Sequence, residues 1–218
     1  MYEEANFMSV QKHLKPGMLA YDIGAYNGET SVLIAQAVGP DNVVIIEPAE
    51  VNWPSIEDRW HREIGFRPRA TFPGFIDSED KLNSSTQIYR QSFPMEAWKG
   101  ILPEEKLEFR WLHYRDEDPN VEARPRLSLD TMASIVGPPA GIVMDIEGAE
   151  LLALRGAACI LAKARPHWWI SIHSQFMEER FHYTAGELHG VMSNADYSGE
   201  LLFDGHEQHW HFFPKESA

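Results

Sequence analysis

The segment Tyr21 to Ser31, YDIGAYNGETS, places two glycines and a carboxylate just before a stretch that resembles a helix. Gly24 and Gly28 let the chain turn sharply and let a ligand approach the backbone. The helix that follows offers unpaired N–H groups at its start, and these groups suit an anion. Glycines at this spacing also occur in purely structural turns. The turn alone is therefore a candidate site for the carboxylate end of a ligand.

Glu47 lies about twenty residues beyond this turn, at the end of the apolar run Val43 to Ile46. A carboxylate in that position can accept both hydroxyls of a ribose. The turn and Glu47 together predict a ligand that contains adenosine. A dinucleotide is disfavoured, because its GxGxxG pattern requires glycine where this chain has Tyr26 and Glu29.

A third group consists of Asp145, Glu147 and His173, which lie at the carboxyl ends of two buried-type strands. Alternation puts the two carboxylates on one side of the chain, and buried carboxylates are costly unless they have partners or a task. His173 is able to take a proton near neutral pH. The alternatives are a helix cap for Glu147, a backbone contact for Asp145 and a structural histidine. A divalent metal between the three side chains is possible by ligand type but is not favoured.

Strand-like and helix-like patterns alternate around these residues, which predicts an α/β fold with a mostly parallel sheet. Apolar runs and capping signals place the elements at 18–23, 29–38, 43–46, 54–64, 69–76, 126–129, 141–146, 149–164, 167–173 and 184–194. Segments 200–203 and 208–213 are joined across Asp204 and Gly205, which indicates a hairpin and hence an antiparallel final strand. We expect one domain over residues 1–218.

Residues 78–125 interrupt this rhythm and are interpreted as an insertion or cap. The segment contains Tyr89, Trp98, Trp111 and Tyr114, whose rings suit either stacking on an acceptor or a small cap core, and we favour the core. The pattern here does not identify an acceptor.

Composition limits the classes of partner. The formal charge is -14 and basic residues do not cluster, so nucleic acid is not expected as a partner. The apolar runs are too short to cross a bilayer, and the acidic start does not resemble an export signal, so we expect a cytoplasmic protein without membrane contact.

Cys159 is expected to be a small buried hydrophobe. His206, His209 and His211 are expected on an edge-strand surface rather than at a zinc ion. Oligomeric state is left open.

Five segments, DIGAYNGETS, VVIIEP, LDTM, VMDIEGAELLALRGA and RPHWWISIH, occur in an order that resembles the FkbM-type S-adenosylmethionine-dependent methyltransferases. The resemblance covers about residues 17–55 and 126–213. It implies a Rossmann-like class I fold with seven strands and an antiparallel C-terminal strand. The chain departs from the family pattern at Tyr26, Asn27 and Met144.

The resemblance also implies roles for individual residues. The methionine part of the cofactor would be surrounded by Asp22, Gly24, Ala25, Tyr26, Asn27 and Gly28. Glu47 would hold the ribose, and Asp77 would contact the adenine by its position. The acceptor would be a hydroxyl on a sugar or small natural product.

Methyl transfer is an in-line displacement, so positioning supplies much of the catalysis, and a hydroxyl also has to lose its proton. Asp145 or His173 is the expected general base, with Glu147 orienting the acceptor or the base. Two alternatives from other classes are a catalytically silent cofactor-binding or scaffold protein and a nicotinamide-dependent oxidoreductase.

Overall fold

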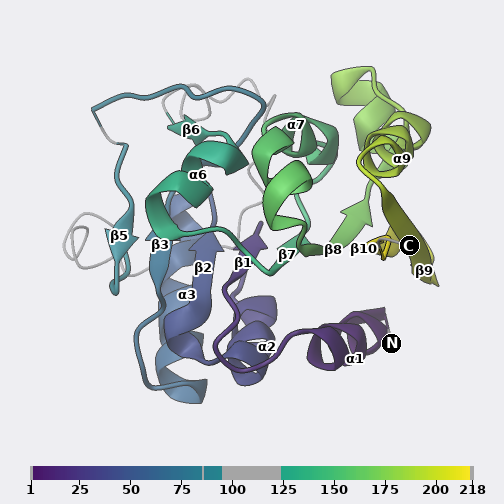
Figure 1. Ribbon diagram of the computed structural model, residues 1–218. Helices are drawn as coiled ribbons and strands as arrows, with labels where there is room; N and C mark the ends of the chain where they lie inside the picture. Colours follow the sequence, from purple (N-terminus) through teal and green to yellow (C-terminus); the bar gives the residue numbers. More distant parts are fainter. Residues whose placement is uncertain (1, 85, 95–123, 217–218) are drawn as a thin grey trace.

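The computed structural model describes residues 2–84, 86–94 and 124–216, and these form a layered α/β structure. An eight-stranded sheet lies at the centre (Figure 1). In spatial order its strands are β5 (Tyr89–Arg90), β3 (Ala70–Phe72), β2 (Val43–Ile46), β1 (Ala20–Ile23), β7 (Gly141–Met144), β8 (His167–Ile172), β10 (Gln208–Pro214) and β9 (Tyr197–Asp204). Strands β3, β2, β1, β7 and β8 run parallel, whereas β5 and β10 are antiparallel to their neighbours.

Helices cover both faces of the sheet, as parallel strands require. On one face lie α1 (Tyr2–His13), α2 (Glu29–Val38) and α3 (Trp53–Glu63); on the other lie α6 (Leu129–Val136), α7 (Glu150–Arg155) and α9 (Ala185–Asn194) (Figure 1). Each helical layer packs one hydrophobic core against the sheet. The remaining short helical segments are η1 (Pro40–Asn42), η2 (Glu50–Asn52), η3 (Ile160–Ala164), α8 (Ser174–Phe176) and η4 (Met177–Phe181).

Several elements match the sequence-based predictions. The unit β1–α2–β2 forms where the two apolar runs bracket a helical pattern, and Pro54 occupies the first turn of α3. Thr184 and Glu187 make both bonds of a capping box at the start of α9. The predicted hairpin is β9 and β10. These elements were predictable because each depends on residues close in sequence.

Other elements differ from the predictions in extent. The strand expected at 69–76 is two strands, because Pro73 and Gly74 interrupt it, and the second piece, β4 (Phe75–Ile76), pairs with β6 (Arg126–Leu127) in a separate small sheet. The strand expected at 126–129 ends at 127, because Ser128 accepts a hydrogen bond from Thr131 N–H and caps α6. The helix expected at 149–164 is broken into α7 and η3.

Three further expectations need correction. The sheet has eight strands instead of seven, since the short β5 adds to the edge at β3. Cys159 is exposed, because the helical pattern around it breaks after α7. His209 and His211 are only 1% exposed, because β10 lies between β8 and β9 and is not an edge strand.

Of the aromatic residues in the expected insertion, Tyr89 lies in β5 and is half-buried. The predictions for Trp98, Trp111 and Tyr114 lie outside the described residues. Among the helices within 2–84, 86–94 and 124–216, none has the length and apolar character needed to cross a bilayer.

Candidate functional site

A cavity of about 390 Å³ lies at the carboxyl ends of the central strands. Parallel α/β sheets bind ligands at this edge, outside the strand ends. Eight of the predicted site residues line it: Asp22, Gly24, Ala25, Tyr26, Asn27, Glu47, Asp145 and Glu147. The cavity therefore joins the three segments that the sequence analysis singled out separately.

The turn after β1 is held tightly against the loop after β7. Gly24 has a φ of +86°, and a Cβ built on it would lie 1.8 Å from the backbone oxygen of Asp145. The Asp145 N–H donates to the carbonyl of Ile23 at 2.9 Å, which fixes the same two loops together. Gly24 is therefore required by the close approach of two backbones that both border the cavity.

Gly28 has a different task. A Cβ on Gly28 would lie 3.1 Å from the Cα of Ile56, so this glycine allows α2 to pack closely on α3. Gly28 does not line the cavity. Its predicted contact with the cofactor remains a prediction, while its packing role is evident from the geometry.

Glu47 connects the ends of β1 and β2. Its Oε2 accepts a hydrogen bond from Tyr26 N–H and its Oε1 accepts one from Ala49 N–H, each at 2.8 Å. Burial raises the pKa of the Glu47 carboxyl to about 7, although both N–H groups act in the opposite direction. Each carboxylate oxygen has a second lone pair, so Glu47 can still accept from a ligand.

Asp22 is buried at the base of the cavity and accepts a hydrogen bond from the Ser31 hydroxyl. Burial raises the pKa of Asp22 to about 7, and the bond from Ser31 partly opposes this. The sequence analysis assigned no role to Ser31. Its position in the first turn of α2, beside a carboxylate at the end of β1, was the available sign.

His173 follows β8 and lies among four carboxylates. Its Nδ1 is 3.1 Å from Glu150 Oε1, and its Nε2 is 2.5 Å from Glu207 Oε2. The same Nε2 is 3.5 Å from Asp145 Oδ1 and 3.8 Å from Glu147 Oε2. The expected trio of Asp145, Glu147 and His173 therefore forms one cluster. Asp145, Glu147 and Glu207 line the cavity, whereas His173 does not.

The electrostatics of this cluster distinguish its members. Burial lowers the pKa of His173, but hydrogen bonds with Glu150 and Glu207 and the charge of Asp145 outweigh burial and raise it to about 11. His173 is therefore an imidazolium at neutral pH. Burial raises the pKa of Glu207, but its bonds with His173 and His209 outweigh this and hold the pKa well below its usual range.

Asp145 is the member of this cluster whose pKa is raised to near neutral, as are the pKa values of Asp22 and Glu47 elsewhere in the cavity. The Asp145 side chain is 42% exposed and borders the cavity, beside Glu147 and the His173 ring. Desolvation raises its pKa to about 7; the charge of His173 opposes this shift, while Glu207 and Glu147 add to it. A group with this pKa is suited to accept a proton near neutral pH.

The sequence analysis missed Glu150 and Glu207. Glu150 belongs to the EGAE segment, and its Oε1 accepts from Gly148 N–H at 3.0 Å as well as contacting His173. Glu207 lies in the turn between β9 and β10, where its Oε1 is also 3.0 Å from His209 Nε2. The motif pointed to Glu150, but the contact of Glu207 depends on β10 lying beside β8.

Asp77 does not line the cavity. Its Oδ1 accepts from Ser78 N–H at 2.6 Å, and its Oδ2 is 3.7 Å from Arg126 Nη1. These contacts stabilise the small sheet of β4 and β6. The predicted adenine contact remains untested.

Asp145, Glu147 and His173 each offer a possible metal-ligand atom within 4.8 Å of the others. The Nδ1 and Nε2 atoms of His173 both already contact carboxylates. A metal ligand has to give up its proton, and this environment holds the proton firmly.

Comparison with known proteins identifies the fold. No family model and no curated protein matches this sequence. Solved structures do match. An FkbM methyltransferase from Methylobacillus flagellatus KT superimposes with a TM-score of 0.55 at 15% identity, covering 95% of this chain and 50% of that chain. The chain has a Rossmann-like class I methyltransferase fold.

Two other structures share this fold over nearly their whole length. An rRNA methylase from Streptococcus thermophilus has a TM-score of 0.53 at 10% identity, covering 98% of this chain and 95% of that one. A proposed rRNA methylase from Clostridium thermocellum has a TM-score of 0.56 at 9% identity, covering 99% and 96%. The chain spans about half the length of the FkbM methyltransferase that it matches.

Proposed function

We propose that this protein is an S-adenosylmethionine-dependent methyltransferase that methylates a hydroxyl group of a sugar or another small molecule. The observation that supports this most is the single cavity bordered by Gly24, Glu47 and Asp145. The same cavity is thus bordered by a turn at Gly24 that suits a carboxylate, by Glu47 as an acceptor for ribose hydroxyls, and by Asp145 as a proton acceptor.

The residues present fit the cofactor. Cavities for ligands of this size occupy about 300–1,000 Å³, and this one has about 390 Å³. The backbone from Gly24 to Asn27 would hold the methionine end, and Glu47 has lone pairs left for the ribose. When bound, the cofactor supplies a methyl group on a positively charged sulfur.

In this proposal the residues of the chain position the acceptor and take its proton. Asp145 accepts the proton of the hydroxyl, since its pKa of about 7 leaves a large fraction ionised at neutral pH. Glu147 orients the acceptor. His173 is a positioning residue, because its two ring nitrogens hold Glu150 and Glu207 and its own proton is not readily released.

A small acceptor is favoured over RNA on electrostatic grounds. The chain has a formal charge of -14, and carboxylates border the cavity. Proteins that bind a nucleic-acid backbone neutralise its phosphates with Lys and Arg, and no stretch of this sequence gathers such residues. Transfer to an RNA substrate would therefore contradict this part of the proposal.

The test compares Asp145→Asn with a matched surface control, Asp58→Asn on α3, whose side chain is 74% exposed. Loss of a general base lowers kcat by about 10²- to 10⁴-fold. Binding of S-adenosylhomocysteine, measured by calorimetry, should stay within about twofold of wild type for both variants, because Asp145 acts on the acceptor. Full turnover by Asp145→Asn would refute its assignment.

The same calorimetry separates the alternative classes. Binding of S-adenosylhomocysteine without transfer to any member of a broad acceptor panel would favour a silent cofactor-binding protein. Binding of a nicotinamide cofactor in a fluorescence titration, with no binding of S-adenosylhomocysteine, would favour an oxidoreductase. Either result would overturn the proposed reaction.

A further inference from the structure

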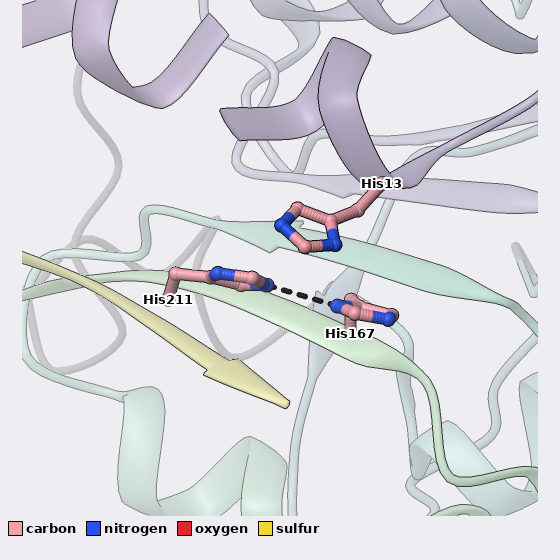
Figure 2. A group of neighbouring side chains, drawn as sticks. All are labelled: His13, His167 and His211. Carbon is pink, nitrogen blue, oxygen red and sulfur yellow. Dashed lines mark hydrogen bonds between the residues drawn. The ribbon is translucent and has the colours of Figure 1, made fainter. Parts of the chain in front are cut away.

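Three histidines meet where β8 begins, at the end of the strands opposite to the cavity. His13 ends α1, His167 begins β8, and His211 lies on the neighbouring β10. Figure 2 shows the His13 ring over the contact between the other two rings. His167 and His173 are six positions apart along the chain, which corresponds to about 20 Å along an extended strand. The His13–His167–His211 cluster is thus separate from the candidate active site.

The ring geometry brings ligand atoms together. His167 Nδ1 and His211 Nε2 are 2.9 Å apart, and each of the three residues offers a nitrogen within 4.8 Å of the others. The His13 ring centroid lies 4.8 Å from that of His167 and 4.7 Å from that of His211. Two imidazole nitrogens on one tetrahedral zinc ion are roughly 3.3 Å apart at Zn–N distances of about 2.0–2.1 Å. Small side-chain rotations are therefore enough to place one ion between the rings.

The cluster also contains a polar atom that its surroundings do not satisfy. His211 Nδ1 is buried and has no hydrogen-bond partner within the described part of the chain. The ring is held in place by stacking on Trp169, with centroids 4.8 Å apart and planes 4° from parallel. When His211 Nε2 binds an ion, Nδ1 carries the ring proton, and a water is the partner that this buried nitrogen calls for.

A metal binds the neutral form of imidazole, and burial favours that form in each of the three rings. Burial lowers the pKa of each, to about 3 for His211, and the neighbouring histidines reinforce the shift in His167 and His211. Glu200 borders the same surface hollow and lies directly opposite His211 across the pairing of β9 and β10. Cross-strand neighbours of this kind share a face of the sheet, so a carboxylate is available beside the rings.

We propose that His13, His167 and His211 bind one divalent transition-metal ion of the zinc class. Imidazole nitrogens favour zinc over magnesium or calcium, which prefer oxygen ligands. Three histidines leave a fourth position, which Glu200 or water completes. Lys12 and Glu200 border the same hollow. The positive charge of Lys12 repels a cation, whereas the negative charge of Glu200 attracts it.

Such an ion would tie α1 to the sheet. At present α1 is connected to β8 by a hydrogen bond from Trp169 Nε1 to the Ser9 hydroxyl at 2.9 Å. The same helix contributes Phe7 and Val10 to the lining of the cavity at the carboxyl ends of the strands. Metal binding where β8 begins would therefore stabilise α1, which forms part of the cavity wall at the opposite ends of the strands.

The test measures zinc bound to tag-free protein by equilibrium dialysis with Zn²⁺ alone, followed by elemental analysis. We expect one ion per chain for wild type. His13→Gln and His167→Gln should weaken binding by about 100-fold or more, since loss of an outer-shell partner alone costs 10–100-fold. His61→Gln, on the exposed surface of α3, is the matched control and should bind like wild type.

Cobalt provides a second readout that a folding defect cannot imitate. Wild type loaded with Co²⁺ should show the visible absorption of a tetrahedral nitrogen-containing site, and His13→Gln should lose it while keeping its circular dichroism spectrum. The proposal is overturned if wild type binds no stoichiometric zinc. It is equally overturned if His13→Gln and His167→Gln bind zinc as wild type does, or if Asp145→Asn removes the bound ion.

Discussion

Replacing Gly24 by alanine probes the contact between the two loops that border the cavity. Gly24 has a φ of +86°, and its new Cβ would lie 1.8 Å from the backbone oxygen of Asp145. Side-chain carbons essentially never approach other atoms to within 3.0 Å, so one of the loops would have to move by about 1.2 Å. The change therefore combines backbone strain with a displacement of the proposed base.

The two contributions can be separated with Gly17→Ala. Gly17 has a nearly equal φ of +89°, lies on the surface, and a Cβ there meets no atom within 4 Å. Left-handed backbone costs roughly 1–2 kcal/mol for a residue with a side chain, and this is the loss expected for Gly17→Ala. Overpacking adds typically 1–3 kcal/mol, so Gly24→Ala should lose roughly 2–5 kcal/mol in the free energy of unfolding.

Urea denaturation measures both losses, and turnover measures the displacement. A shift of about 1 Å at reacting groups can reduce the rate about 100-fold, so Gly24→Ala should lose that much activity even where it is fully folded. Gly17→Ala should retain wild-type turnover. The reasoning is refuted if the two variants are equally stable and equally active.

Two further perturbations test the described contacts. His173 has its pKa raised from 6.5 to about 11, so its ion pairs stabilise the fold fully below pH 6.5 and progressively less as the pH rises toward 11. The free energy of unfolding should therefore fall between about pH 6.5 and 11, and Glu207→Gln should reduce that slope; equal slopes would argue against the pairing. Thr184→Ala removes the capping box of α9 and should cost about 1 kcal/mol in urea denaturation, whereas Ser193→Ala, exposed on the same helix, should change stability by under about 0.5 kcal/mol. Similar losses in both variants would contradict the cap.

Local patterns predicted most of the elements that carry the cavity. The turn after β1, the strand before Glu47 and the strand that leads to Asp145 were each visible as apolar runs with polar residues at their ends, although β7 ends two residues earlier than the predicted strand. In a parallel sheet the carboxyl ends of strands lie at one edge, so their convergence was also predictable. Eight of the predicted residues line the same cavity.

The roles within the carboxylate cluster were not predictable in this way. Asp145 and His173 were both reasonable bases from their residue types. Their surroundings separate them, because Glu150 and Glu207 hold the proton on His173 while burial raises the pKa of Asp145 to about 7. Glu207 reaches His173 only because the hairpin inserts β10 beside β8.

The insertion of β10 also explains the main error about the C-terminal histidines. Alternation correctly places His209 and His211 on one face, but alternation does not reveal whether a strand lies at an edge or inside a sheet. Strand order decides this, and it buries both residues. The same order brings His211 to His167, while α1 supplies His13 from the other end of the chain.

The sequence by itself determined the alternation of strands and helices, the turn at Gly24 and the carboxylates that follow the strands. These features depend on periodicity and on backbone preferences within a few residues. Only the tertiary structure decided that burial raises the pKa of Asp145, why Gly24 has to lack a side chain, and which histidines meet. Those properties depend on distances and burial between residues far apart in the chain, which no local pattern contains.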